Sequence, residues 1–162
     1  MKPIFIKQLL IAIVFFGGST IYFKERYYIA IDTQLEPCLY ATVFLVDKWD
    51  KNFMPGELMV FDFHLNSPVL KQGDDVVKVV AGMPNEEVKY DGQTVSVEGR
   101  KAVNTDIREG MDRLGVQFAE NSKLELGDGE YFLVGQRPLS FDSRYWGAVN
   151  DKQIIGKAYA IY

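Results

Sequence analysis

The fold is decided by one stretch, residues 75–84 (Asp75-Val76-Val77-Lys78-Val79-Val80-Ala81-Gly82-Met83-Pro84). Its four valines predict a buried β-strand, which the glycine and the proline bring to an end. Side chains alternate between the two faces of a strand, so Val76, Lys78 and Val80 share one face. The other face is apolar as well, and a lysine therefore stands in a strand with no evidently solvated side.

Two interpretations of Lys78 follow from this stretch. If the side chain is buried, the charged form of its amine is disfavoured, and a neutral amine can act as a general base. If the strand lies at the edge of a sheet, the amine reaches water and has no special role. The stretch alone favours the second interpretation, and the rest of the chain has to decide between them.

Composition narrows the class of protein. The chain has 162 residues, which suffice for one globular domain with an appendage, and its formal charge of −4 argues against nucleic acid as a partner. The single cysteine, Cys38, excludes an intrachain disulfide. The single histidine, His64, excludes a histidine-rich metal site, and we expect neither a metal nor another cofactor.

The N-terminus predicts a membrane anchor. Residues 9–23 carry no charge, and the 20 residues from Ile4 to Phe23 include only Lys7 as a charged residue. A membrane-spanning helix needs about 20 apolar residues. A cleaved signal peptide is the alternative, but no small-x-small site precedes Lys24. We expect residues 1–26 to form a cytoplasmic tip and a single-pass helix in the inner (cytoplasmic) membrane, with the lipid bilayer as a partner and residues 27–162 on the periplasmic, outer side.

After the anchor the chain is predicted to be mostly β. Strand-like segments cover residues 42–47, 57–63, 87–90, 93–97, 101–103, 130–134 and 153–161. Asp91-Gly92 is a strong hairpin signal between two of these segments. Residues 104–129 are polar and are expected to form a loop-rich excursion. No amphipathic helix is predicted outside the anchor.

Several motifs occur in an order that resembles one known family. The matching segments are residues 44–48 (FLVDK), 55–61 (PGELMVF), 77–84 (VKVVAGMP), 135–147 (GQRPLSFDSRYWG) and 154–158 (IIGKA). In this order, behind an apolar N-terminal segment, they resemble the type I signal peptidases, and the resemblance extends over nearly the whole chain. The resemblance implies a signal-peptidase-like antiparallel β domain behind one transmembrane helix. It also implies an endopeptidase that processes exported precursor proteins outside the cytoplasm.

The resemblance also implies a catalytic pair. In this family a serine attacks the scissile carbonyl and a neutral lysine takes its proton, which makes Lys78 the base. The serine is missing from residues 34–37 (QLEP). The smaller TraF-type peptidases of conjugative systems have a Ser-x-Pro-x-Gly-x-Tyr pattern, against which residues 38–44 (CLYATVF) align with Cys38 as the nucleophile. Cys38 and Lys78 are 40 residues apart, a separation that suits the shorter family members.

Three supporting residues follow from the same resemblance. Ser140 matches the serine that orients the lysine, and Asp142 and Arg144 match the pair that braces the site. The chain departs from the family at Gln136-Arg137, where the family has Asp-Asn. Outside this resemblance, His64 is predicted to be an exposed turn residue. The aromatic residues Phe61, Phe63, Tyr131 and Phe132 are predicted to form core or membrane-surface contacts.

The predicted function is proteolysis by a Cys/Lys pair in place of Ser/Lys. The substrate would be an exported precursor, with pilin maturation in a conjugative type IV secretion system as the specific expectation, by hydrolysis or by cyclisation. The alternative is an inactive peptidase-fold subunit, with Cys38 as a small buried side chain, that binds pilin or assembles with the conjugation apparatus. A carbohydrate-binding β domain is a third class, which would not depend on Lys78.

Overall fold

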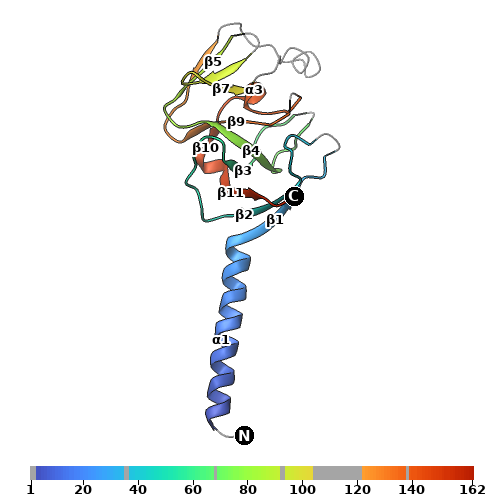
Figure 1. The fold of residues 1–162 in the computed structure, drawn as a ribbon, viewed down its shortest axis with the longest axis vertical. Coiled ribbons are helices and arrows are strands. Elements are labelled where there is room, and N and C mark those ends of the chain that lie inside the picture. The colour runs from blue at the N-terminus through green and yellow to red at the C-terminus, as the bar shows by residue number, and fades with distance from the viewer. Residues whose placement is uncertain (1–2, 35–36, 68, 92–93, 104–121, 138) are drawn as a thin grey trace.

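A computed structural model describes residues 3–34, 37–67, 69–91, 94–103, 122–137 and 139–162. Figure 1 shows a long helix, α1 (Pro3–Arg26), that leads into a β domain. The strands of the domain are β1 (Tyr27–Ile31), β2 (Val43–Asp47), β3 (Leu58–Asp62), β4 (Asp75–Gly82), β5 (Glu87–Tyr90), β6 (Val95–Val97), β7 (Arg100–Val103), β8 (Lys123–Glu125), β9 (Glu130–Val134), β10 (Val149–Asn150) and β11 (Ile154–Ala160). The predicted mostly-β class is confirmed.

The larger sheet has seven strands in the order β1-β2-β11-β3-β4-β9-β10, and its pairs are antiparallel. The strand that carries Lys78 therefore lies inside the sheet, between β3 and β9. Lys78 stands opposite Met59 of β3, and its side chain is 2% exposed. The edge-strand interpretation is wrong, because β9 pairs with the side of β4 that would otherwise meet water.

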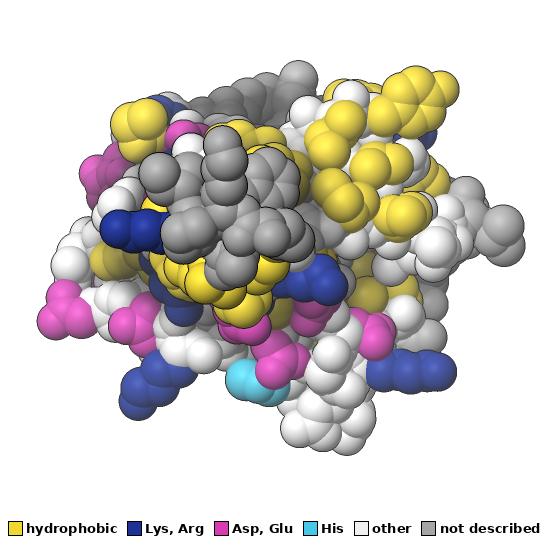
Figure 2. Space-filling model, turned by 90° about the horizontal axis from the view of Figure 1, so that it is seen from below, with side chains coloured by type: hydrophobic (Ala, Val, Ile, Leu, Met, Phe, Trp, Pro, Cys, Tyr) yellow, Lys and Arg dark blue, Asp and Glu magenta, His cyan; other side chains and the backbone are white. Residues whose placement is uncertain are grey.

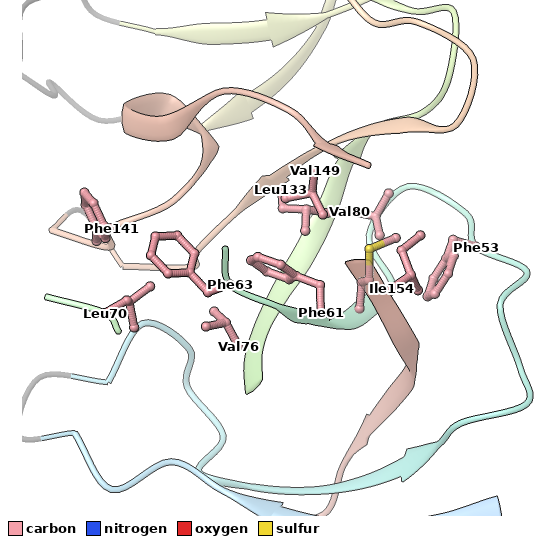
Figure 3. Close-up of a cluster of buried hydrophobic side chains, with 11 residues drawn as sticks. Phe53, Phe61, Phe63, Leu70, Val76, Val80, Leu133, Phe141, Val149 and Ile154 are labelled. Atoms are coloured by element: carbon pink, nitrogen blue, oxygen red, sulfur yellow. The ribbon is translucent and has the colours of Figure 1, made fainter. Parts of the chain in front are cut away.

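Alternation along β4 is confirmed residue by residue. Val76, Lys78 and Val80 are buried, whereas Val77 and Val79 are half-buried. Val76 and Val80 belong to the main hydrophobic cluster, which Figure 3 shows running from Phe53 and Ile154 to Leu70 and Phe141. Lys78, the candidate general base, therefore lies on the face of β4 that packs into the core. The aromatic residues Phe61, Phe63 and Phe132 are buried, as predicted.

A second sheet has four strands in the order β7-β6-β5-β8. The predicted hairpin is confirmed by the antiparallel pairing of β5 with β6, although residues 92–93 of its turn lie outside the described residues. The predicted excursion over residues 104–129 lies outside the description as far as residue 121. Its described part contains β8, a strand that the sequence did not predict because it has only three residues and all of them are exposed.

Several further elements were not predicted, β10 among them. β1 follows the helix without a break and pairs with β2 from Tyr27↔Asp47 to Ile31↔Val43. The short helix α3 (Ser143–Trp146) lies within the predicted loop motif and is capped by Asp142, whose side chain accepts a hydrogen bond from Arg144 N. A single helical turn of this kind is too short to leave an amphipathic period.

The predicted anchor corresponds to α1. Within the described residues, α1 included, no helix combines the length and the hydropathy that crossing a bilayer requires. The prediction of a membrane-spanning segment within residues 1–26 is therefore not confirmed. The helix joins the domain through Arg26, whose Nη2 lies 2.5 Å from Oδ2 of the buried Asp47. The hydrogen bond from Arg26 lowers the pKa of Asp47.

Gly156 tests the packing of the larger sheet, because the backbone of β2 passes close to it. A Cβ at this position would lie 2.2 Å from Asp47 O and 2.8 Å from Lys48 Cα. We expect Gly156→Ala to lower the free energy of unfolding by about 1–3 kcal/mol, measured by urea denaturation. Gly18→Ala is the control, since a Cβ there meets nothing within 4 Å. Equal urea midpoints for the two variants would contradict the strand packing.

Candidate active site

Lys78 is held by a serine from a distant part of the chain. Its Nζ donates a long hydrogen bond of 3.4 Å to Ser140 Oγ. Both side chains are 2% exposed, so the contact is closed off from bulk water. In the described part of the chain no carboxylate forms an ion pair with this amine. The structure thus brings together two of the predicted site residues.

Cys38 lies in the irregular segment between β1 and β2 and is half-buried. It lines the same cavity as Lys78, with a volume of about 370 Å³. The walls are contributed by the end of β1 with the residues after it, by Leu39 and Phe44, by Val69 and Leu70, and by the start of β4. Cys38 and the buried Lys78 therefore line one cavity, although they lie 40 residues apart in the sequence.

The loop from Gly135 to Ser140 approaches both residues closely. A Cβ at Gly135 would lie 1.9 Å from Ser140 Oγ and 3.0 Å from Cys38 O, so only glycine fits there. Gly135 N donates to Asp142 Oδ2 at 2.8 Å, and Ser140 N donates to Arg137 O at 3.1 Å. These contacts fold the loop onto itself and bring Ser140 toward β4.

Asp142 and Arg144 form a fully buried ion pair beneath this loop. Arg144 donates from Nε to Asp142 Oδ1 at 2.7 Å and from Nη2 to Asp142 Oδ2 at 2.8 Å, a bidentate geometry. Arg144 Nη2 also donates to Ser140 O at 3.0 Å. Burial, the largest influence on the Arg144 pKa, lowers it, but the hydrogen bond and charge of Asp142 outweigh that influence and raise the pKa. The guanidinium stays charged and braces the loop.

Other sequence predictions can be placed against this site. His64 is exposed, as predicted, and its Nε2 lies 3.1 Å from Asp62 Oδ2, outside the cavity lining. Sequence reasoning missed the cavity wall formed by residues 30–34, because β1 was not predicted. It noted Gln136-Arg137 only as a departure from the family, although both residues contact the Cys38 segment.

The family follows from the whole chain. The family model described as signal peptidase, peptidase S26, matches residues 4–162. The chain therefore belongs to this family, and the predicted resemblance to signal peptidases is confirmed. The TraF-type subfamily and the role of Cys38 as nucleophile stay predictions.

Individual relatives match over part of their length. Signal peptidase I V of Bacillus subtilis is 30% identical over 101 residues, which are 54% of this chain and 60% of that protein. Signal peptidase IB of Staphylococcus aureus is 32% identical over 115 residues, 63% of this chain and 56% of that protein. The chain thus spans less than two thirds of these curated relatives. A signal peptidase I structure from Enterococcus faecalis aligns with a TM-score of 0.42 at 27% identity, covering 67% of this chain and 97% of that one.

The buried ion pair generates a stability prediction. Arg144→Met would leave the Asp142 carboxylate buried without its partner, which costs about 3–5 kcal/mol in comparable sites. We expect a loss of that size in the free energy of unfolding, measured by chemical denaturation. Arg100→Met is the matched control, because Arg100 pairs with Glu86 at the surface, where an ion pair contributes less than about 1 kcal/mol. Similar losses in both variants would contradict the bracing role of Arg144.

Proposed function

We propose that this protein is a signal-peptidase-like endopeptidase that uses Cys38 as nucleophile and Lys78 as general base. One observation carries the proposal: Cys38 and Lys78 line the same cavity, and the Lys78 amine is buried and bound only to a neutral serine in the described structure. A general base must be able to accept a proton, and a lysine without a carboxylate partner is not held as an ion pair.

The chemistry proceeds in two steps. Lys78 takes the proton of the Cys38 thiol while Sγ attacks the scissile carbonyl, and the amine then returns this proton to the leaving amino group. The N-terminal part of the substrate is left as a thioester on Cys38. Water, deprotonated by Lys78, hydrolyses the thioester and restores the thiol. Ser140 keeps the amine aimed at the cavity through both steps, and Asp142 with Arg144 keeps the loop of Ser140 in place.

The substrate is proposed to be an exported precursor protein, and within that class a pilin precursor of a conjugative type IV secretion system. Support comes from family membership and from the partial match of residues 38–44 to the TraF-type pattern. That match keeps the nucleophile position at Cys38 and an aromatic ring at Phe44, but it loses the proline and the glycine at Tyr40 and Thr42. Resolution of the thioester by water gives a linear product, and resolution by the pilin's own amine gives a cyclic one.

The protein is further proposed to work at the outer surface of the cytoplasmic membrane, attached through α1. Many apolar side chains of α1 are exposed, from Leu9 to Phe23. Apolar side chains also gather at one end of the larger sheet: Ile29, Leu45 and Tyr159 lie in register across β1, β2 and β11, and Ile31 and Ile161 continue this apolar sheet face. Figure 2 looks along α1 toward the domain and shows hydrophobic side chains gathered to one side of the helix.

An inactive subunit that binds pilin or assembles with the conjugation apparatus is the second candidate. The observation that favours it is the replacement of the family serine by Cys38. Burial of Lys78 against Ser140 favours the enzyme, since an inactive subunit has no need of a buried amine, which is costly to desolvate.

Processing of a precursor separates these candidates. We expect Cys38→Ala and Lys78→Met each to reduce cleavage of a co-expressed pilin precursor by at least about 100-fold, since each removes one partner of the proton transfer. Cleavage is followed by the mass of the pilin. Lys71→Met is the matched control, because Lys71 is an exposed lysine on the neighbouring loop.

Two outcomes would reject the proposed enzymatic function. Unchanged processing in both variants would show that the Cys/Lys pair does not carry the reaction. A wild-type chain that binds the precursor and leaves its mass unchanged would assign the protein to the inactive class. A Cys38→Ser variant that cleaves faster than wild type would show that the cavity still accepts the family's usual nucleophile.

Membrane attachment has a separate test. We expect the full-length chain to co-sediment with phosphatidylglycerol/phosphatidylcholine vesicles. Phe15→Asp should weaken the binding at least tenfold, because an aspartate costs about 3 kcal/mol in the apolar part of a bilayer. Leu65→Asp is the control, since Leu65 is an exposed apolar residue that belongs neither to α1 nor to the apolar sheet face. Equal binding of all three proteins would contradict attachment through α1.

A further inference from the structure

The backbone of residues 38–40 is bound by the loop that carries Ser140. Gln136 N and Arg137 N both donate to Cys38 O, at 2.9 and 3.3 Å. Tyr40 N donates to the side-chain Oε1 of Gln136 at 2.9 Å, and Arg137 Nε donates to Leu39 O at 3.3 Å. These four hydrogen bonds satisfy polar backbone groups of a segment that belongs to no strand.

The same loop also reaches the base. Ser140 lies four residues after Gln136 and accepts the hydrogen bond from Lys78 Nζ. At its start, Gly135 N is tied to Asp142 Oδ2, so the loop is fixed at both ends by the buried ion pair. One short, braced loop therefore contacts the backbone of the proposed nucleophile at one end and the proposed base at the other.

Gln136 contributes polar contacts and little burial. Gln136, Arg137 and Tyr40 are all exposed, and the Arg137 guanidinium lies 5.3 Å from the centre of the Tyr40 ring. Replacing an exposed glutamine removes no core packing, so the stability of the fold depends little on which residue stands at position 136. What the side chain does provide is an acceptor for Tyr40 N, two residues after Cys38.

We propose that Gln136 is a positioning residue that fixes Cys38 relative to Lys78 by holding Tyr40 N on the Ser140 loop. The inference rests on the proposed function, because it gives the Cys/Lys pair its geometry. A nucleophile displaced by about 1 Å can lose on the order of 100-fold in rate. Removing the hydrogen bond between Gln136 and Tyr40 N should therefore lower kcat, because residues 38–40 are held less firmly. The substrate still enters the cavity, so KM should stay nearly unchanged.

The test compares three full-length variants with wild type. Gln136→Leu removes the acceptor, Gln136→Glu keeps an acceptor oxygen at the same distance along the side chain, and Leu139→Ala alters an exposed residue of the same loop. Three quantities are measured: hydrogen–deuterium exchange of the peptide that contains Tyr40, kcat and KM for a precursor peptide, and the pH profile of Cys38 alkylation by iodoacetamide, with Lys78→Met as its reference.

The expected result is confined to one variant. Gln136→Leu should exchange the Tyr40 amide about fivefold faster, since this variant removes the acceptor of that amide's hydrogen bond. Its kcat should fall about tenfold or more with KM within about twofold of wild type, and its alkylation profile should move toward that of Lys78→Met. Gln136→Glu should restore all three readouts, and Leu139→Ala should match wild type.

Contrary results are distinguishable. Unchanged exchange in Gln136→Leu overturns the proposed contact, and faster exchange with unchanged kcat and alkylation profile overturns its positioning role. If the wild-type chain cleaves no precursor, the proposed function fails by itself. The alkylation profile then decides on Gln136: a shift toward Lys78→Met that Gln136→Glu reverses supports the positioning role, and an unshifted profile overturns it.

Discussion

The buried ion pair between Asp142 and Arg144 is the contact on which the rest of the site depends. A buried pair adds little net stability compared with apolar side chains of the same volume, but losing one partner is costly. Its effect here is geometric. Asp142 binds Gly135 N, and Arg144 binds Ser140 O, so the two charged side chains fix both ends of the loop from Gly135 to Ser140. That loop in turn contacts Lys78 and the backbone of Cys38.

The site is thus assembled from three places in the chain. The larger sheet supplies a rigid position for Lys78, inside β4 and on the face that packs into the core. The segment between β1 and β2 supplies Cys38, which lacks a strand of its own and takes its position from the loop. Because the sheet and the loop are both internally fixed, Lys78 and the Cys38 segment hold set positions at the cavity that they line. Such preorganisation is what the proposed nucleophile and base would require.

Local patterns in the sequence predicted much of this. The valine alternation placed Lys78 on a face with Val76 and Val80. The contacts of Ser140, Asp142 and Arg144 were implied by the resemblance of residues 135–147 to the family motif. The burial of the Lys78 side chain could not be predicted, because it depends on which strand pairs with the second edge of β4. The contact of Gln136 with Tyr40 N was equally hidden, since it joins a side chain to a backbone amide 96 residues away. Isolated short elements such as β8 and α3 leave too few residues for a periodic signal.

The central claim is that Cys38 forms a covalent intermediate with the help of Lys78, and a trapped adduct tests it most directly. The full-length chain is mixed with a precursor peptide, quenched in acid within the first turnover, and analysed by intact mass and by mapping of the Cys38 peptide. The account predicts an adduct on Cys38 equal in mass to the N-terminal fragment, removable by hydroxylamine and missing from Lys78→Met. Cleavage of the precursor without any adduct on Cys38 at any quench time, and at an equal rate in Cys38→Ala, would contradict it.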